Sequence, residues 1–173
     1  MITATTRTVM MHGKALELTG NEVHVGQAAP DCTAVDNALK PVRLADLSER
    51  VLVLSAVPSL DTSVCSLETK RFNDEAQKLG SDVKIVTISM DLPFAQKRWC
   101  GAEGAHNVVT LSDHRDASFG MNYGVLLKDL RLLARCVFVV GPDRKVSYIQ
   151  LVEEISKEPD YAAVLAAVAK ARQ

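Results

Sequence analysis

The chain has 173 residues, of which 47% are hydrophobic and 24% charged, and its formal net charge is −1. This length suffices for one well-buried domain and is short for two, so we expect residues 1–173 to form a single domain. The near-neutral charge argues against electrostatic capture of nucleic acid or of an anionic membrane. No apolar stretch has the length of a transmembrane helix, and residues 1–7 lack the apolar core of a signal peptide, so we expect a cytoplasmic protein.

The N-terminal residues 1–20 are a predicted extension of this domain. Residues 6–12 and 15–18 are typical of two strands, and Gly13 between them predicts the turn of a β-hairpin. The hairpin carries no recognisable chemical motif. Further on, residues 30–36 predict a short strand with alternating faces, and residues 42–47 predict a strand end with one helical turn.

The stretch from residue 51 to residue 73 organises the chain. Residues 51–57 are an apolar run rich in valine and leucine that Pro58 stops, and a polar loop then leads into helical spacing, which predicts a buried strand feeding a helix. With Thr62 or Ser63 as N-cap, Cys65 lies in the first turn of that helix, where backbone N–H groups lack helical partners and the dipole is positive. A thiol there loses its proton more readily, and the thiolate is the nucleophile.

The helical spacing also predicts where the Cys65 side chain points. At 100° per residue it falls within the same apolar arc as five neighbours. These neighbours are Val64, Leu67, Phe72, Ala76 and Leu79. Cys65 is therefore expected to face the core side, in a pocket. The alternative on position alone is a small cysteine that packs beneath a strand and has no chemical role.

A second apolar strand is predicted at residues 83–89, so residues 51–89 form a βαβ unit with a parallel strand pair and a right-handed crossover. Cys65 then lies beyond the carboxyl end of the first strand, where α/β folds place their sites. A second helix is predicted from residue 91 through Cys100, with Gly101 and then Gly104 ending it. Cys100 in its last turn could be released by fraying; the alternative is another buried cysteine.

The remaining elements complete an α/β domain. A strand at 108–112, a short helix at 117–123 closed by Gly124, a hairpin of strands at 136–140 and 145–151, and an apolar C-terminal helix at 161–168 are predicted in that order.

The four cysteines are Cys32, Cys65, Cys100 and Cys136. They contain neither a C-x-x-C pair nor a close Cys/His cluster, so the sequence predicts neither a zinc site nor a thioredoxin-type dithiol motif. His106 and His114 are interpreted as solvated loop residues rather than metal ligands. In a reducing compartment, any disulfide is expected to be transient and catalytic.

The spacing Pro58-x-x-x-Thr62-x-x-Cys65 resembles the active-site pattern of the peroxiredoxins, and residues 58–65 look like the thiol peroxidase branch, the atypical two-cysteine peroxiredoxins. The similarity runs nearly end to end. Three further stretches carry it, at residues 91–104, 133–135 and 158–161. It implies a thioredoxin-like α/β fold with a central mixed sheet, flanking helices and an N-terminal β-hairpin.

The resemblance also implies a reaction, in which a thiolate reduces hydrogen peroxide or an organic hydroperoxide without a metal, haem, flavin or other cofactor. Cys65 is by this resemblance the peroxidatic cysteine, which becomes a sulfenic acid. Cys100 is the resolving cysteine, which condenses with it to an intramolecular disulfide that thioredoxin reduces. The family also implies a homodimer.

Three other residues are candidate members of the site, and each has a plainer interpretation. Thr62 offers a hydroxyl that can accept from the peroxide and donate to sulfur, or it is simply the N-cap. Pro58 removes a backbone N–H and shields the pocket from water, or it only ends the strand. Arg135 supplies a permanent positive charge with several donors; without the resemblance it would be taken for a surface residue.

Disulfide formation between Cys65 and Cys100 requires their Cα atoms to lie within roughly 7 Å of each other. Cys65 and Cys100 lie at opposite ends of two different helices, so we predict that the reduced protein holds them farther apart and that bridging requires local unwinding. Cys136 stands where the family commonly has a small apolar residue, and on a core strand it is expected to be inert. The alternative, because it directly follows Arg135, is that more than two cysteines react; for Cys32, interpreted as a packed side chain, that alternative is weaker.

Two other classes of function are compatible with these residues. One is a thiol–disulfide oxidoreductase that acts on proteins, against which the missing C-x-x-C counts. The other is a redox sensor or binding module in which oxidation of Cys65 only changes the binding partner.

Overall fold

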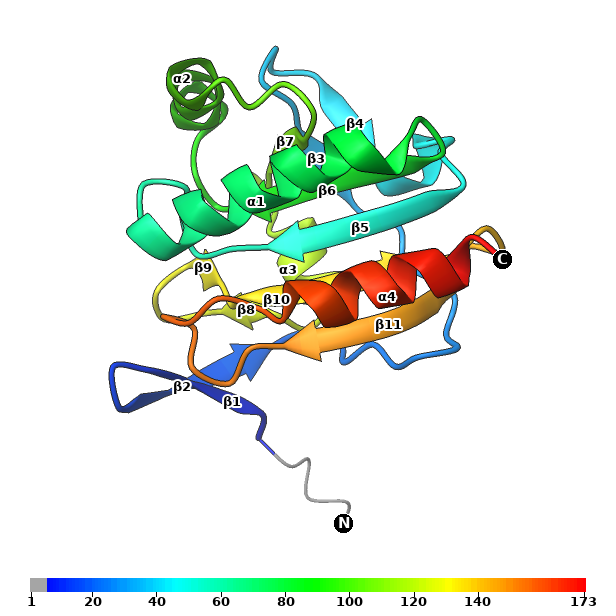
Figure 1. Cartoon of the computed structure of the whole chain (residues 1–173). Coiled ribbons are helices and arrows are strands. Elements are labelled where there is room, and N and C mark those ends of the chain that lie inside the picture. Colours follow the sequence, from blue (N-terminus) through cyan, green and yellow to red (C-terminus); the bar gives the residue numbers. More distant parts are fainter. Residues whose placement is uncertain (1–5) are drawn as a thin grey trace.

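A seven-stranded mixed sheet runs through the centre of the computed structural model, which describes residues 6–173 (Figure 1). The first five residues, part of the predicted extension and of the segment considered for a signal peptide, lie outside the described residues. The strands are β1 (Thr8–Met11), β2 (Lys14–Thr19), β3 (Thr33–Val35), β4 (Pro41–Arg43), β5 (Val51–Ala56), β6 (Val83–Ser89), β7 (Val109–Ser112), β8 (Leu126–Leu127), β9 (Leu132–Leu133), β10 (Cys136–Val140) and β11 (Val146–Leu151). The helices are the 3-10 turn η1 (Leu44–Asp46), α1 (Ser63–Leu79), α2 (Pro93–Glu103), α3 (Ser118–Asn122) and α4 (Tyr161–Ala171).

The strand order of the central sheet is β11-β10-β5-β6-β7-β3-β4. The predicted βαβ unit is confirmed, because β5 and β6 pair in parallel, and β7 continues the parallel part beside β6. The predicted hairpin of β10 and β11 is antiparallel and lies on the other side of β5. The carboxyl ends of β5 and β6 therefore share one edge, where the loop to α1 and the start of α2 emerge.

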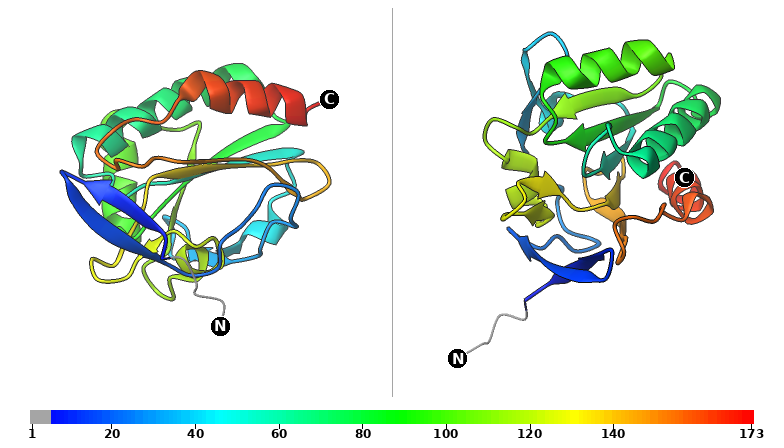
Figure 2. Two further views of the ribbon diagram at one scale, coloured as in Figure 1. Left: turned by 90° about the horizontal axis from the view of Figure 1, so that it is seen from below. Right: turned by 90° about the vertical axis from the view of Figure 1, so that its left-hand side faces the viewer.

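Alternate residues of β5 face two separate cores, as the period of two in a strand requires. Val51 and Val53 pack in the core beneath α1 and α4, with Phe72 and Val164. Leu52 and Leu54 face the opposite core, which α3 and the N-terminal hairpin cover. Figure 2 shows α1 and α4 on one side of the sheet and the hairpin on the other. None of the helices in residues 6–173 is long and apolar enough to cross a membrane.

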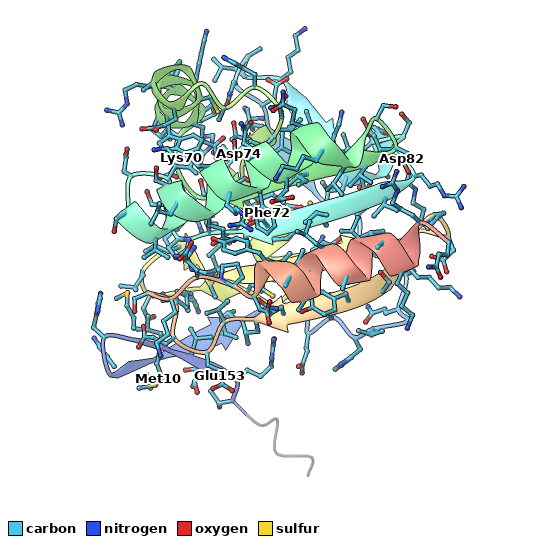
Figure 3. The ribbon with its side chains drawn as sticks, viewed as in Figure 1. Met10, Lys70, Phe72, Asp74, Asp82 and Glu153 are labelled. Carbon is cyan, nitrogen blue, oxygen red and sulfur yellow. The ribbon has the colours of Figure 1, made fainter. Side chains whose placement is uncertain are left out.

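The predicted N-terminal hairpin is present, with His12 and Gly13 in its turn at φ values of +51° and +80°. It continues into a second, four-stranded sheet, because β2 pairs with β8 and β8 with β9, two short strands that the sequence pattern did not indicate. The hairpin also docks on the segment after β11: the Met10 N–H donates to the Glu153 carbonyl oxygen at 2.6 Å. The labelled Met10 and Glu153 lie side by side in Figure 3.

Two details of the helices differ from the sequence-based expectation. Leu67, expected on the inner face of α1, is 55% exposed, and Val64 is only half-buried. The inner face is rotated toward Glu68, which finds polar partners inside the protein, and Leu67 lies 100° away from it. Helix α2 passes through Gly101 and ends at Gly104, whose φ of +63° permits the left-handed cap.

Candidate active site

Cys65 lies in the first turn of α1, as predicted, and its side chain is fully buried. The loop that leads from β5 into this helix is held by Asp91, whose carboxylate accepts from the Leu60 N–H at 2.8 Å and from the Ser59 hydroxyl at 2.6 Å. Asp91 itself follows β6. The residues that follow two adjacent parallel strands thus hold the loop that leads into the first turn of α1, where Cys65 lies.

Arg135 is buried beside Cys65 rather than at the surface. It directly precedes β10, and β10 pairs with β5 so that Cys136 lies opposite Ala56, the last residue of β5. This register brings the guanidinium to the loop after β5, where Nη2 donates to the Cys65 Sγ at 3.2 Å. The side chain is held from a second direction, because its Nε donates to the Ile155 carbonyl oxygen at 3.0 Å.

Glu68 is part of this site, although it was not among the residues predicted from the sequence. It follows Cys65 by three residues on the same face of α1, is fully buried, and forms an ion pair with Arg135 Nη1. Its other carboxylate oxygen accepts from the Ser55 hydroxyl at 2.8 Å. The i,i+3 spacing of an acidic residue from the cysteine was the signal available in the sequence.

The electrostatics of the pair follow from its burial. Burial raises the pKa of Glu68, opposed by the positive charge of Arg135 and by its hydrogen bonds. Burial lowers the pKa of Arg135, but the charges of Glu68 and Cys65 and their hydrogen bonds outweigh it, so that this pKa is raised overall. Arg135 is therefore a permanently charged donor at the sulfur.

A pocket of about 170 Å³ opens beside these groups. Its wall includes Pro58, Thr62 and Arg135, three of the predicted site residues. Its lining also includes Met11 and His12 of the N-terminal hairpin, and Ile155 and Ser156. The hairpin, in which the sequence showed no chemical motif, is thus a wall of this pocket because β1 docks on the segment after β11.

Thr62 is the N-cap residue of α1, and its hydroxyl proton has a different partner from the one expected. The hydroxyl donates to the Ser59 carbonyl oxygen at 2.8 Å, and it neither caps the helix nor donates to the Cys65 sulfur. Its oxygen lone pairs remain able to accept a proton donor in the pocket. Pro58 is buried at the end of β5, where it contributes no N–H.

Cys100 lies in the last turn of α2, half-buried and outside this pocket. Its Sγ contacts the Thr110 hydroxyl at 3.5 Å and the Asn37 amide nitrogen at 4.0 Å. All four cysteines are free thiols. The structure thus places Pro58, Thr62 and Arg135 at one pocket, and the buried Cys65 behind it in contact with Arg135. Cys100 lies in different surroundings.

The other two cysteines lie in the core. Burial raises the pKa of the Cys32 thiol, with further contributions from the charges of Asp113 and Asp31. Burial also raises the pKa of the Cys136 thiol. A raised pKa disfavours the thiolate, which is the nucleophilic form. Of the two histidines considered as metal ligands, His106 is exposed, whereas His114 is half-buried, with its Nδ1 2.9 Å from the Ser112 hydroxyl.

Comparison with known proteins decides the family. A family model described as Redoxin matches residues 24–165. The chain belongs to the Redoxin family. A curated relative named thiol peroxidase, from Oceanobacillus iheyensis, is 55% identical to it over 86% of this chain and 90% of that protein. Another thiol peroxidase, from Bacillus subtilis, is 52% identical over 88% of this chain and 91% of that protein.

A solved structure shows the same architecture as this Redoxin-family chain. The peroxiredoxin-like protein from Aquifex aeolicus superposes with a TM-score of 0.89 at 41% sequence identity, covering 95% of this chain and 96% of that one. The predicted thioredoxin-like fold is thereby confirmed, and so is the predicted resemblance to the thiol peroxidases. The protein is an enzyme of the peroxiredoxin class, with thiol peroxidase activity.

Proposed function

We propose that this enzyme reduces hydrogen peroxide and organic hydroperoxides by a cycle in which Cys65 is oxidised and Cys100 resolves the oxidised state. One observation carries the proposal: the Cys65 sulfur lies 3.2 Å from a buried guanidinium, at the start of a helix and beside a pocket. A positive charge and a helix N-terminus both favour the thiolate form, which is the nucleophile.

In the first step the Cys65 thiolate attacks the terminal oxygen of the hydroperoxide. A sulfur–oxygen bond forms, the O–O bond breaks, and the leaving alkoxide or hydroxide takes a proton to become an alcohol or water. Arg135 and the free N–H groups at the start of α1 stabilise the negative charge on the oxygens. The Thr62 oxygen accepts from the peroxide O–H and so orients it, while Pro58 and the hairpin exclude water.

In the second step the Cys65 sulfenic acid condenses with the Cys100 thiol. The two sulfurs form a disulfide, and the sulfenic hydroxyl leaves with the thiol proton as water. Because the two free thiols have separate partners in this structure, local unwinding of the helices must bring them together. The dithiol of thioredoxin then reduces the disulfide by exchange, and is itself oxidised to a disulfide.

We further propose that the chain acts as a single-domain cytoplasmic protein and assembles as a homodimer. The single domain is supported by the continuity of the central sheet from β11 to β4, whose two faces are both covered.

The test is peroxide consumption in the presence of thioredoxin, thioredoxin reductase and NADPH. Wild type is compared with Cys65→Ser, Cys100→Ser and, as matched control, Cys32→Ala, which leaves both reacting thiols in place. We expect no turnover with Cys65→Ser, and with Cys100→Ser one fast oxidation for each chain without thioredoxin-linked turnover. Normal turnover of Cys100→Ser would exclude its resolving role. A single oxidation of wild type without turnover would favour a sensor.

A further inference from the structure

The Cys100 sulfur is held by two polar side chains that come from other parts of the central sheet. Thr110 belongs to β7, and Asn37 lies in the turn between β3 and β4. Figures 1 and 2 show α2 beside this turn. The two side chains also contact each other, because the Thr110 hydroxyl lies 3.1 Å from the Asn37 amide oxygen.

The direction of these hydrogen bonds follows from the number of protons available. The Thr110 hydroxyl has one proton, and it donates this proton to the Asn37 oxygen. The Cys100 thiol must therefore be the donor in its 3.5 Å contact with Thr110. The Asn37 amide nitrogen lies 4.0 Å from the Cys100 sulfur, and the amide oxygen is the atom that contacts Thr110. The three groups form a closed set in which the thiol proton is engaged.

Both partners of Cys100 are firmly positioned. Thr110 is 4% exposed and sits in a strand paired with β6. Asn37 follows Asp36, whose carboxylate accepts from the Ala38 N–H at 2.8 Å and from the Lys40 N–H at 2.9 Å. Neither partner belongs to α2, so unwinding of α2 would break the contacts of Cys100 with Asn37 and Thr110.

The groove beside Cys100 is separate from the pocket beside Cys65. Its lining includes Asn37, His106 and Thr110, and none of its lining residues belongs to the other pocket. Helix α2 is also linked to α1, because Trp99 Nε1 donates to the hydroxyl of Ser66, the residue after Cys65, at 3.1 Å. A second link is the ion pair between Lys70, labelled in Figure 3, and Glu103. These two links do not involve the Cys100 sulfur, whereas Asn37 and Thr110 contact it directly.

We infer that Asn37 and Thr110 are positioning residues that retain Cys100 away from Cys65, and that release of this thiol sets the rate of disulfide formation. The inference rests on the proposed function, in which Cys100 is the resolving thiol. While Cys100 is retained, the Cys65 sulfenic acid survives and is exposed to a second peroxide, which converts it to sulfinic acid. The contacts of Cys100 therefore also set the peroxide concentration at which the enzyme is inactivated.

The test compares Thr110→Val, which removes the hydroxyl at nearly constant shape, with Thr110→Ser, which keeps it. The rate of disulfide formation is measured after one equivalent of hydrogen peroxide, by acid quench, thiol alkylation and intact mass. We expect Thr110→Val to form the disulfide about fivefold faster, as loss of one ordinary hydrogen bond implies. Half-conversion of Cys65 to sulfinic acid should need about fivefold more peroxide, with Thr110→Ser close to wild type.

Two further measurements keep the result interpretable. The rate of the first oxidation of Cys65 should be unchanged in Thr110→Val, because a general loosening of the fold would alter both steps. Asn37→Ala, in an exterior turn, is the second variant should Thr110→Val fold poorly, and it should also speed disulfide formation. An unchanged or slower disulfide step in these variants would overturn the inference. Disulfide formation by Cys100→Ser at the wild-type rate would instead overturn the proposed function.

Discussion

Arg135 and Glu68 form an ion pair inside the protein, with side chains that are 2% and 0% exposed. Arg135 uses one terminal nitrogen for this pair and the other for the Cys65 sulfur. Since Glu68 follows Cys65 by one helical turn, the same helix presents both the sulfur and the carboxylate to one guanidinium. The carboxylate thereby fixes the plane of the Arg135 guanidinium relative to the sulfur, and in the proposed reaction it acts only through Arg135.

Replacing Glu68 should destabilise the fold strongly. Glu68→Ala leaves the Arg135 charge buried without its carboxylate, and breaking such a pair typically costs about 3–5 kcal/mol in the free energy of unfolding. Urea unfolding of the reduced protein measures this difference. The matched control is Asp61→Ala, which breaks the exposed pair between Asp61 and Arg98 and should have a much smaller effect. Equal effects of the two substitutions would contradict the importance of burial.

Replacing Arg135 should slow the first oxidation more than it alters the fold. Arg135→Lys retains a positive charge for Glu68, but its single ammonium group cannot replace the two guanidinium nitrogens that contact the carboxylate and the sulfur together. We expect the second-order rate constant of Cys65 with hydrogen peroxide to fall by about 100- to 1,000-fold, the range for loss of one donor that stabilises a transition state. Stopped-flow kinetics measures it, with Arg98→Lys as control. A rate within threefold of wild type would remove Arg135 from the mechanism.

The hairpin should influence the choice of substrate. Met11 lines the pocket, so Met11→Ala removes apolar contact that a bulky hydroperoxide can use and that hydrogen peroxide is too small to reach. We expect KM for cumene hydroperoxide to rise by about tenfold, while KM for hydrogen peroxide stays near wild type. Met10→Ala is the matched control, because successive side chains of a strand point to opposite faces and Met10 does not line the pocket. A parallel change for both peroxides would contradict this role of Met11.

Alkaline pH should reduce stability through the buried thiols. Burial raises the pKa of Cys136 above its ordinary value of 9.0. Above that pH the thiol ionises in the unfolded chain while it stays protonated in the folded one, so the unfolded state binds fewer protons. Stability is therefore retained below pH 9 and falls as pH rises beyond it, by about 1.4 kcal/mol per pH unit for each such thiol.

Urea unfolding of reduced protein between pH 8 and pH 10.5 checks this expectation. Cys136→Ala should lower the free energy of unfolding by the same amount at every pH. It should also make the fall of this free energy with pH less steep, by the contribution of one thiol. If the unfolding free energy of Cys136→Ala falls with pH as steeply as that of wild type, Cys136 does not contribute to the pH dependence.

The sequence by itself determined the local elements and the position of Cys65. An apolar run stopped by Pro58 and followed by helical spacing places Cys65 in the first turn of a helix, because strand, loop and helix depend on neighbouring residues. The hairpins and the parallel pair of β5 and β6 follow from similarly short-range patterns. Arg135 entered only through resemblance to a family, since no local pattern connects it to a cysteine 70 residues earlier.

Only the tertiary structure decided which side chains surround each sulfur. The register of β10 on β5 buries Arg135, and this buried charge favours Glu68 over Leu67 on the inner face of α1, where apolar periodicity alone predicted Leu67. The docking of β1 makes the hairpin a pocket wall, and the turn before β4 brings Asn37 to Cys100. Such contacts join residues far apart in the chain, so their energies depend on packing and charge in three dimensions rather than on local sequence.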